Sequence, residues 1–251
     1  MGMQAGELSE LLPEGALWIN GRRHREASGG ELTHVDPNTG RPLKAFPIAG
    51  PAEIDLAVAA ARQAFPAWKR LPAPARRDLL LAIADRLAAE ADALAGIGAL
   101  DAGTPVIAGV ALSSAVPTEW FRYYAGWVDK LEGTVPASSD PATFAYTRRV
   151  PFGVVALITA FNAPMAFVAM KVAGALAAGN TVVLKPSELA PWSVIRFAEI
   201  CKEVGVPDGV INVIPGNARA GEALVTHKDV DRISFTGGEQ TARAIMVAAA
   251  Q

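Results

Sequence analysis

The sequence predicts an α/β fold in which an open, Rossmann-like parallel sheet carries helices on both faces. Four short apolar runs alternate with four segments of helical length over residues 150–251, which is typical of strands joined by crossover helices. The runs lack the polar alternation of a half-exposed strand, as expected where both faces of a sheet are covered. We also expect an N-terminal helical layer and a β arm beside this sheet.

The composition is that of a folded chain with a nearly neutral surface. The 251 residues are 51% hydrophobic and 19% charged, with a formal net charge of -2. This balance excludes disorder and argues against nucleic acid or a membrane surface as the main partner. With one cysteine and three scattered histidines, we expect neither an internal disulfide nor a metal site. We therefore expect a reducing, cytoplasmic compartment. The segment Met1 to Glu10 lacks the apolar core of a leader peptide.

The first fifty residues are expected to form short strands and turns. Asn20-Gly21 predicts a hairpin turn and residues 36–40 predict a second turn, because Asn, Pro and Gly favour turn backbone angles. Apolar residues at three- and four-residue spacing predict three helices after residue 50, at 51–65, 75–95 and 119–131. Pro66, Pro72 and Pro74 are expected to end the first of these helices.

The third of these helices carries Trp120, Tyr124 and Trp127 on one face, which we interpret as helix packing rather than a ligand cage. Residues 134–149 differ from it, because they are rich in Thr, Ser and Pro and then alternate between aromatic and basic residues. This pattern predicts an extended arm that leaves the helical layer.

Strands and helices alternate regularly from residue 150 onward. The predicted strands are 154–158, 181–184, 211–214 and 232–235, and the helices that follow them are 166–178, 192–204, 218–226 and 239 to the end. The longest apolar stretch, residues 150–178, is interrupted by Gly153, Asn162, Pro164 and Lys171. We therefore interpret it as a strand, a turn and a helix, not as a membrane span.

Polar and small residues follow each predicted strand. They are Phe161, Asn162 and Pro164, then Lys185–Glu188, then Pro215–Asn217, and finally Thr236–Gly238. In a parallel sheet these turns share one edge, where open α/β sheets bind ligands and where helix N-termini favour anions such as a pyrophosphate. Lys185 suits a phosphate or a ribose hydroxyl, and Glu188 suits ribose hydroxyls while repelling a 2′-phosphate. The alternative is a solvated turn in which Glu188 lies near a helix cap.

Common nucleotide motifs do not fit the chain. Gly216 and Gly221 have the spacing of a P-loop, but Glu222-Ala223 follows where a lysine and a hydroxyl residue are required. No Gly-x-Gly-x-x-Gly follows a predicted strand. The chain is therefore not expected to be a P-loop nucleotide hydrolase.

Several stretches in the right order resemble the aldehyde dehydrogenase superfamily of NAD(P)-dependent enzymes. They are Phe121–Trp127 with Lys130–Gly133, Pro151–Val155 with Phe161–Pro164, Gly179–Glu188, and Phe235–Gly237. The resemblance runs from about Trp18 to the end of the chain. It implies NAD-dependent oxidation of an aldehyde to a carboxylic acid, with residues 1–133 and 150–251 as an incomplete cofactor-binding part and residues 134–149 as an arm for homo-oligomerisation.

The resemblance also implies roles for individual residues. Asn162 matches an amide that stabilises the oxyanion of the thiohemiacetal intermediate, and Lys171 matches a lysine near the active centre. NAD, rather than NADP, is the expected cofactor. The matching cofactor-binding positions are Ile158, Phe161, Lys185, Ser187, Glu188, Gly216, Gly221, Phe235, Thr236, Gly237 and Gly238. Phe161, Gly238 and Ala242 depart from the usual Trp, Ser and Gly.

In the family, the nucleophilic cysteine and the general-base glutamate lie beyond the fourth strand–helix unit. We therefore expect this chain to be truncated before the catalytic cysteine and inactive alone. Cys201 lies on an apolar helical stripe with Val194, Phe197 and Val204, which predicts a buried structural thiol. The alternative function is a non-catalytic dinucleotide-binding or assembly module of the same ancestry.

Overall fold

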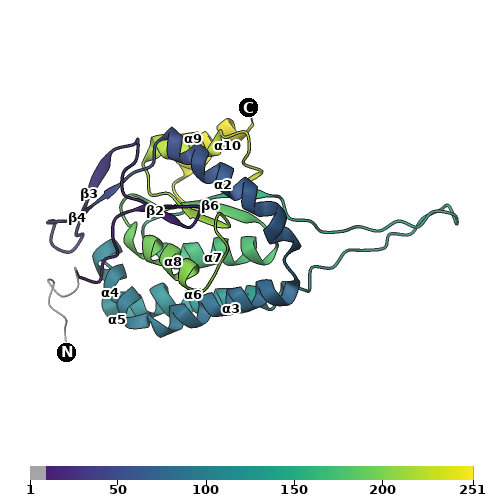
Figure 1. Ribbon diagram of the computed structural model, residues 1–251, viewed down its shortest axis with the longest axis horizontal. Coiled ribbons are helices and arrows are strands. Elements are labelled where there is room, and N and C mark those ends of the chain that lie inside the picture. Colours follow the sequence, from purple (N-terminus) through teal and green to yellow (C-terminus); the bar gives the residue numbers. More distant parts are fainter. Residues whose placement is uncertain (1–9, 251) are drawn as a thin grey trace.

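A six-stranded sheet lies between two layers of helices in the computed structural model, which describes residues 10–250 (Figure 1). The strand order is β2-β1-β7-β6-β5-β8. The strands are β1 (Leu17–Ile19), β2 (Arg22–His24), β5 (Val154–Ile158), β6 (Thr181–Lys185), β7 (Ile211–Val213) and β8 (Arg232–Phe235). A separate hairpin is formed by β3 (Glu31–Val35) and β4 (Pro42–Pro47).

The four strands predicted in the second half of the chain are present and parallel. β5 pairs with β6 and β8, and β6 pairs with β7. The α/β class with a parallel sheet is therefore confirmed. The sheet is mixed at its other edge, because β1 runs antiparallel to β7 and β2 continues the hairpin predicted at Asn20-Gly21. The hairpin was predictable from local sequence. The pairing of β1 with β7 was not, because it joins residues almost 200 positions apart.

The strand order reverses beside β5. From β5 the chain adds β6 and then β7 on one side, and it then returns to place β8 on the other side. Ligands of open α/β sheets bind outside the carboxyl ends of the strands at such a reversal. The topology therefore predicts a ligand site at the carboxyl ends of β5 and β8.

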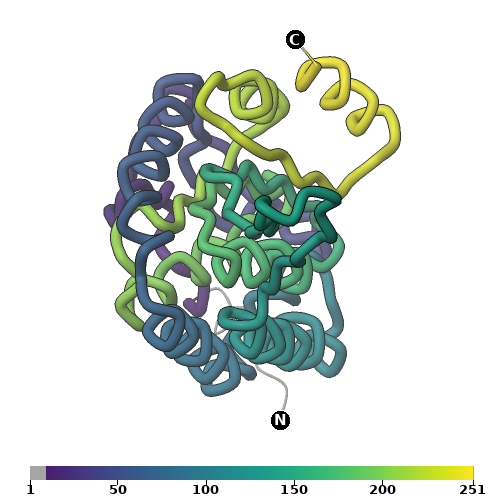
Figure 2. Tube along the Cα trace, turned by 90° about the vertical axis from the view of Figure 1, so that its right-hand side faces the viewer, coloured from purple at the N-terminus to yellow at the C-terminus, as the bar shows by residue number. Residues whose placement is uncertain are grey.

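Helices cover both faces of the sheet, as predicted. One face carries α2 (Pro51–Arg70), α9 (Ala218–Val225) and α10 (Glu239–Ala249), which lie in the upper part of Figure 1. In Figure 2, α9 and α10 are at the top and α2 runs down the left side. The other face carries α7 (Pro164–Ala177) and α8 (Trp192–Glu203), and outside them lie α3 (Ala73–Ala89), α4 (Ala91–Ala102), α5 (Val106–Val110) and α6 (Val116–Ala125). Each face has its own apolar core.

The N-terminal helices differ from the prediction. α2 continues through Pro66 to Arg70, so the expected stop at this proline was wrong. The helix predicted over 75–95 is two helices divided at Glu90, whose carboxylate accepts hydrogen bonds from Arg196 of α8 at 2.6 and 2.9 Å. The sequence analysis missed α5 and the π-helical turn at Ala111–Ala115 that leads into α6. α6 itself ends at Ala125 rather than near residue 131.

Residues 134–149 project from the body as a long extended excursion (Figure 1). Its two sides meet near the base, where the Thr147 amide donates to the Thr134 carbonyl at 2.8 Å and the Thr134 amide donates to Thr147 Oγ1 at 2.8 Å. The predicted arm is extended, but the structure has no regular strand in it. Pro136 and Pro141 lack the backbone N–H that a ladder of hydrogen bonds requires.

Within residues 10–250, no single helix is both long and apolar enough to cross a membrane. One bent pair of helices, Ala91–Ala102 with Val106–Ala125, reaches the required length and apolar composition together. The expectation about a leader peptide falls mainly on residues 1–9, which lie outside the described residues.

Asp101 fixes the outer helical layer to the start of α8. Its buried carboxylate accepts hydrogen bonds from the Trp192 amide at 3.0 Å, the Ser193 amide at 2.9 Å and Ser193 Oγ at 2.7 Å. Burial raises the pKa of the Asp101 carboxyl, and the three donors oppose that rise. The side chain therefore acts as a helix cap supplied by a distant helix.

We expect Asp101→Ala to lower the free energy of unfolding by about 2 kcal/mol, because it leaves two buried amides at the start of α8 without an acceptor. Urea denaturation followed by circular dichroism measures this loss. Asp92→Ala is the matched control, since Asp92 is an exposed acid of the same helix and should change stability by about 0.5 kcal/mol or less. Equal effects of the two substitutions would contradict the capping role.

Candidate functional site

A cleft of about 530 Å³ opens between α9 and α10 at the carboxyl edge of the sheet. Its floor is formed by Ile158, Lys185 and Phe235, which end β5, β6 and β8 respectively. Val225, Ala244, Ile245 and Ala248 give it apolar walls, and Ala218, Gly221, Glu222, Gln240 and Thr241 complete the lining. We refer to this space as the α9–α10 cleft, and it lies where the strand order reverses.

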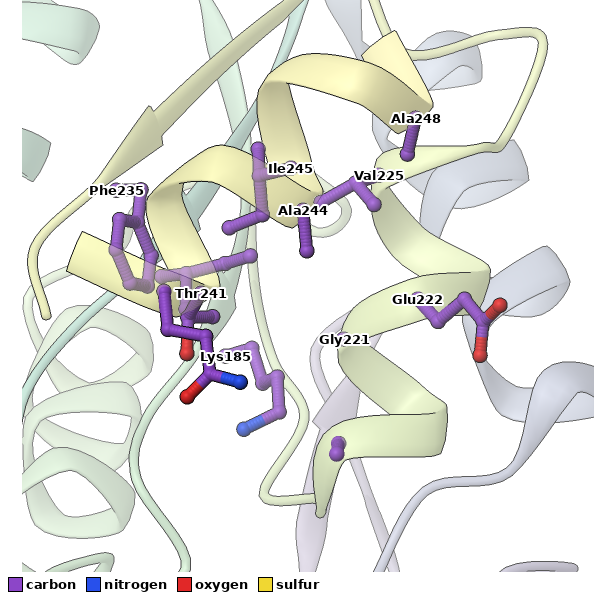
Figure 3. A pocket seen from close by; sticks show the side chains of 12 residues that line it. Lys185, Gly221, Glu222, Val225, Phe235, Thr241, Ala244, Ile245 and Ala248 are labelled. Carbon is purple, nitrogen blue, oxygen red and sulfur yellow. The ribbon is translucent and has the colours of Figure 1, made fainter. Parts of the chain in front are cut away.

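Lys185 is the charged group on the floor of the cleft. Figure 3 shows its side chain reaching into the space between Thr241 on α10 and Gly221 on α9. Its Nζ donates to the Pro186 carbonyl at 3.1 Å and lies 3.7 Å from Glu188 Oε2. Burial lowers the pKa of Lys185, and the Glu188 carboxylate acts in the opposite direction. An ammonium has three donors, so this group retains capacity for an oxygen ligand in the cleft.

Gly216 and Gly221 have different structural roles. A Cβ at Gly216 would lie 2.6 Å from the Ala220 Cβ, so glycine is required for the chain to enter α9, and Gly216 does not line the cleft. A Cβ at Gly221 would meet the Lys185 side chain at 3.7 Å. Glycine at residue 221 therefore keeps the space above Lys185 open.

The two helix N-termini at this edge are not equivalent. Asn217 caps α9, because its side-chain oxygen accepts from the Arg219 amide at 3.0 Å and the Ala220 amide at 3.4 Å. α10 begins after Gly238 with no side-chain cap, so its first amides are available to an outside acceptor. The general expectation of anion-binding helix ends therefore fits α10 better than α9.

The remaining predicted cofactor residues lie along the same edge but do not line the cleft. They are Phe161, Ser187, Glu188, Gly216, Thr236, Gly237 and Gly238. The Thr236 amide donates to the Ile158 carbonyl at 3.0 Å, which ties the turn after β8 to β5. Ser187 Oγ accepts from the Leu189 amide at 3.2 Å inside its own turn. Four predicted residues thus meet in the cleft, and the other seven surround it.

The two predicted catalytic residues lie elsewhere. Asn162 is exposed in the turn between β5 and α7. Lys171 is half-buried on α7, where its Nζ donates to Ser234 Oγ on β8 at 2.8 Å and where burial lowers its pKa. It lines a separate space of about 390 Å³ between α7 and β8. The structure therefore does not bring Asn162 or Lys171 into the α9–α10 cleft.

The sequence analysis missed the walls of the cleft. It named turns that follow strands, whereas Val225, Gln240, Thr241 and Ile245 come from helix faces. The amphipathic spacing of Thr241, Ile245 and Ala248 was a readable signal, but it does not distinguish a ligand-facing stripe from a core-facing stripe.

Cys201 lies on the buried face of α8. Its side chain is 3% exposed, and burial raises the pKa of its thiol well above the ordinary value. The thiol is therefore protonated at neutral pH, whereas nucleophilic cysteines require the thiolate.

We expect Cys201 of the folded chain to resist a thiol-reactive disulfide reagent at pH 7 and to react fully once urea unfolds the chain, because folding both buries and protonates the thiol. Absorbance of the released chromophore measures the reaction, and denatured protein is the control. Rapid labelling of folded protein would show that Cys201 is an accessible nucleophile.

A family model described as "Aldehyde dehydrogenase family" matches residues 24–251. The chain is 41% identical over 239 residues to "Aldehyde dehydrogenase [NAD(P)+] 2" of Saccharomyces cerevisiae, covering 94% of this chain and 47% of the yeast protein. It is 39% identical over 239 residues to "Phenylacetaldehyde dehydrogenase" of Pseudomonas fluorescens, covering 92% and 47% of the two chains.

Solved structures of relatives have the same fold over the part that this chain covers. PnpE from Pseudomonas sp. WBC-3 in complex with nicotinamide adenine dinucleotide is 42% identical with a TM-score of 0.92, covering 95% of this chain and 49% of PnpE. An aldehyde dehydrogenase from Bacillus cereus, solved as an NAD+ complex, is 36% identical with a TM-score of 0.93, covering 100% and 51%. The chain thus spans about half the length of the relatives it matches.

Proposed function

The chain belongs to the aldehyde dehydrogenase family, and we propose that it supplies the NAD-binding part of an enzyme that oxidises an aldehyde to a carboxylic acid. The observation that carries this proposal is the buried Lys185 on the floor of the α9–α10 cleft, at the reversal of strand order. PnpE and the Bacillus cereus relative were solved with NAD, which supports the choice of cofactor.

The residues that line the cleft, together with Glu188 beside it, fit the adenosine half of a dinucleotide. Lys185 offers a donor and Glu188, one third exposed, offers an acceptor at 3.7 Å from it, which suits neighbouring ribose hydroxyls. The apolar walls contributed by Val225 and Ile245 suit a flat base. The negative charge of Glu188 disfavours a 2′-phosphate, so we propose NAD rather than NADP.

Other residues of this edge take supporting roles in the proposal. The uncapped amides after Gly238 bind an anionic group. The exposed Asn162 amide donates a hydrogen bond to the oxygen of the aldehyde as negative charge develops on it. Bound NAD supplies the hydride acceptor. We also propose that Lys171 belongs to the active centre, although it lies on the face of the sheet opposite the α9–α10 cleft.

The oxidation also needs a nucleophile. The chain has one cysteine, and the burial of Cys201 removes it from that role. We therefore propose that the catalytic cysteine and glutamate are not among these 251 residues and that this chain alone does not oxidise aldehydes. A non-catalytic dinucleotide-binding or assembly module is the second candidate. The intact mass of the native protein distinguishes the two candidates, because it shows whether the native protein is longer than these 251 residues.

We propose that residues 1–133 and 150–251 form the cofactor-binding part of the chain. The arm at residues 134–149, which lies between them in the sequence, is proposed to join copies of the chain. Phe144 is 77% exposed and Tyr146 is 67% exposed on it. Large exposed aromatic side chains on a projecting segment favour contact with another chain.

We expect Glu188→Gln to weaken NAD binding by about tenfold to a hundredfold, because charge-assisted hydrogen bonds contribute about 1.5–3 kcal/mol. The same change should favour NADP relative to NAD, since it removes the repulsion of the 2′-phosphate. Calorimetric titration with each dinucleotide measures both effects. Lys202→Ala, an exposed change on the following helix α8, is the control and should alter neither affinity.

We expect Lys185→Met to weaken NAD and NADP alike, because it keeps the apolar stem and removes the ammonium shared by both ligands. The same titrations measure this loss, with thermal unfolding as a check on folding. Unchanged affinity for both dinucleotides in the Lys185 and Glu188 variants would place the cofactor elsewhere.

A further inference from the structure

The turn that carries Glu188 has few bonds of its own. Between the end of β6 and the start of α8, Ser187 accepts from the Leu189 amide at its Oγ and from the Ala190 amide at its carbonyl, both at 3.2 Å. Lys185 Nζ adds the bond to the Pro186 carbonyl at 3.1 Å. The Leu189 side chain is exposed. The position of Glu188 relative to Lys185 therefore depends on groups outside the turn as well as on the 3.7 Å ion pair between the two side chains.

His34 of the β3–β4 hairpin supplies one such group. The histidine is 4% exposed, and its Nε2 lies 3.0 Å from the Leu189 carbonyl oxygen, 155 residues along the chain. A carbonyl oxygen only accepts, so Nε2 carries the proton. The ring packs edge-on against Trp192 at 6.2 Å, and Phe46 of β4 packs against the same indole at 5.4 Å. The hairpin thus holds the segment from Leu189 to Trp192.

The segment after β4 also contacts a second turn of the same edge. The Ala49 amide donates to the Pro215 carbonyl at 2.8 Å, and a Cβ at Gly216 would lie 3.5 Å from the Ala49 carbonyl oxygen. Two of the four turns at the carboxyl edge are therefore braced by residues 34–49. Directly after the first turn, Asp101 of α4 accepts from the Trp192 and Ser193 amides, so the hairpin and α4 together hold the end of this turn.

We propose that His34 is a positioning residue for the dinucleotide site, because its bond to the Leu189 carbonyl holds Glu188 beside Lys185 and so sets the preference for NAD over NADP. The inference rests on the proposed function of the α9–α10 cleft. His34 does not line that cleft and acts through the adjoining backbone. A side chain that lies in a distant hairpin thereby controls a specificity contact.

The test compares His34→Leu, which removes the donor, with His34→Gln, whose amide reaches a similar position and keeps it. Calorimetric titration gives the dissociation constants of NAD and NADP for each variant. We expect His34→Leu to weaken NAD binding by about threefold to tenfold, the effect of one hydrogen bond. NADP binding should change less, so the selectivity ratio falls. His34→Gln should restore the ratio.

The ratio distinguishes positioning from a general loss of stability. A smaller folded fraction weakens both dinucleotides by the same factor and leaves their ratio unchanged. Asn38→Ala is the matched control, because Asn38 joins the same hairpin to the Ala99 carbonyl at 2.8 Å and does not contact the Glu188 turn. It should lower the melting temperature without changing the ratio. In a Glu188→Gln background, His34→Leu should no longer change the ratio.

Each outcome bears on the inference. A wild-type chain that binds NAD, together with an unchanged ratio in His34→Leu, overturns the role of His34 and leaves the proposed function standing. A wild-type chain that does not bind NAD overturns the proposed function and this inference with it. If His34→Leu does not fold, His34→Asn makes the same comparison, because its shorter amide does not reach the Leu189 carbonyl.

Discussion

The parallel register of β8, β5 and β6 is the constraint on which the candidate site depends. Ile158 is the Cα partner of Lys185 on one side and of Phe235 on the other, and these three residues form the floor of the α9–α10 cleft. A shift of one residue would turn each side chain to the other face of the sheet. Strand pairing therefore does more than stabilise the domain, because it selects which side chains face the cleft.

Burying the Lys185 ammonium is unfavourable unless nearby acceptors compensate. The Pro186 carbonyl and Glu188 provide that compensation, and both belong to the turn whose position is controlled by residues outside it. The N-terminal hairpin and Asp101 both hold the end of this turn, at Leu189 and Trp192. The charge in the cleft is thus maintained by contacts between segments that are up to about 150 residues apart.

Features that depend on local sequence were predictable. The apolar runs, the Asn20-Gly21 turn and the residues after each strand identified the sheet, its carboxyl edge and Lys185. Features that depend on distant partners were not. Glu90 divides a helical segment where Arg196 binds it, and β1 joins the sheet through β7. His34 contacts Leu189 across 155 residues, and nothing in the sequence around His34 indicates that contact. The assignment of individual roles, such as that of Asn162, came from family resemblance and stays a prediction.

Hydrogen exchange of the full chain with and without NAD tests the central claim most directly. If the α9–α10 cleft holds the dinucleotide, NAD should slow amide exchange in the turns 186–191 and 236–238 and in α9 and α10. It should leave exchange in the arm at residues 134–149 unchanged. Protection confined to the space around Lys171, or no protection at saturating NAD, would contradict the account.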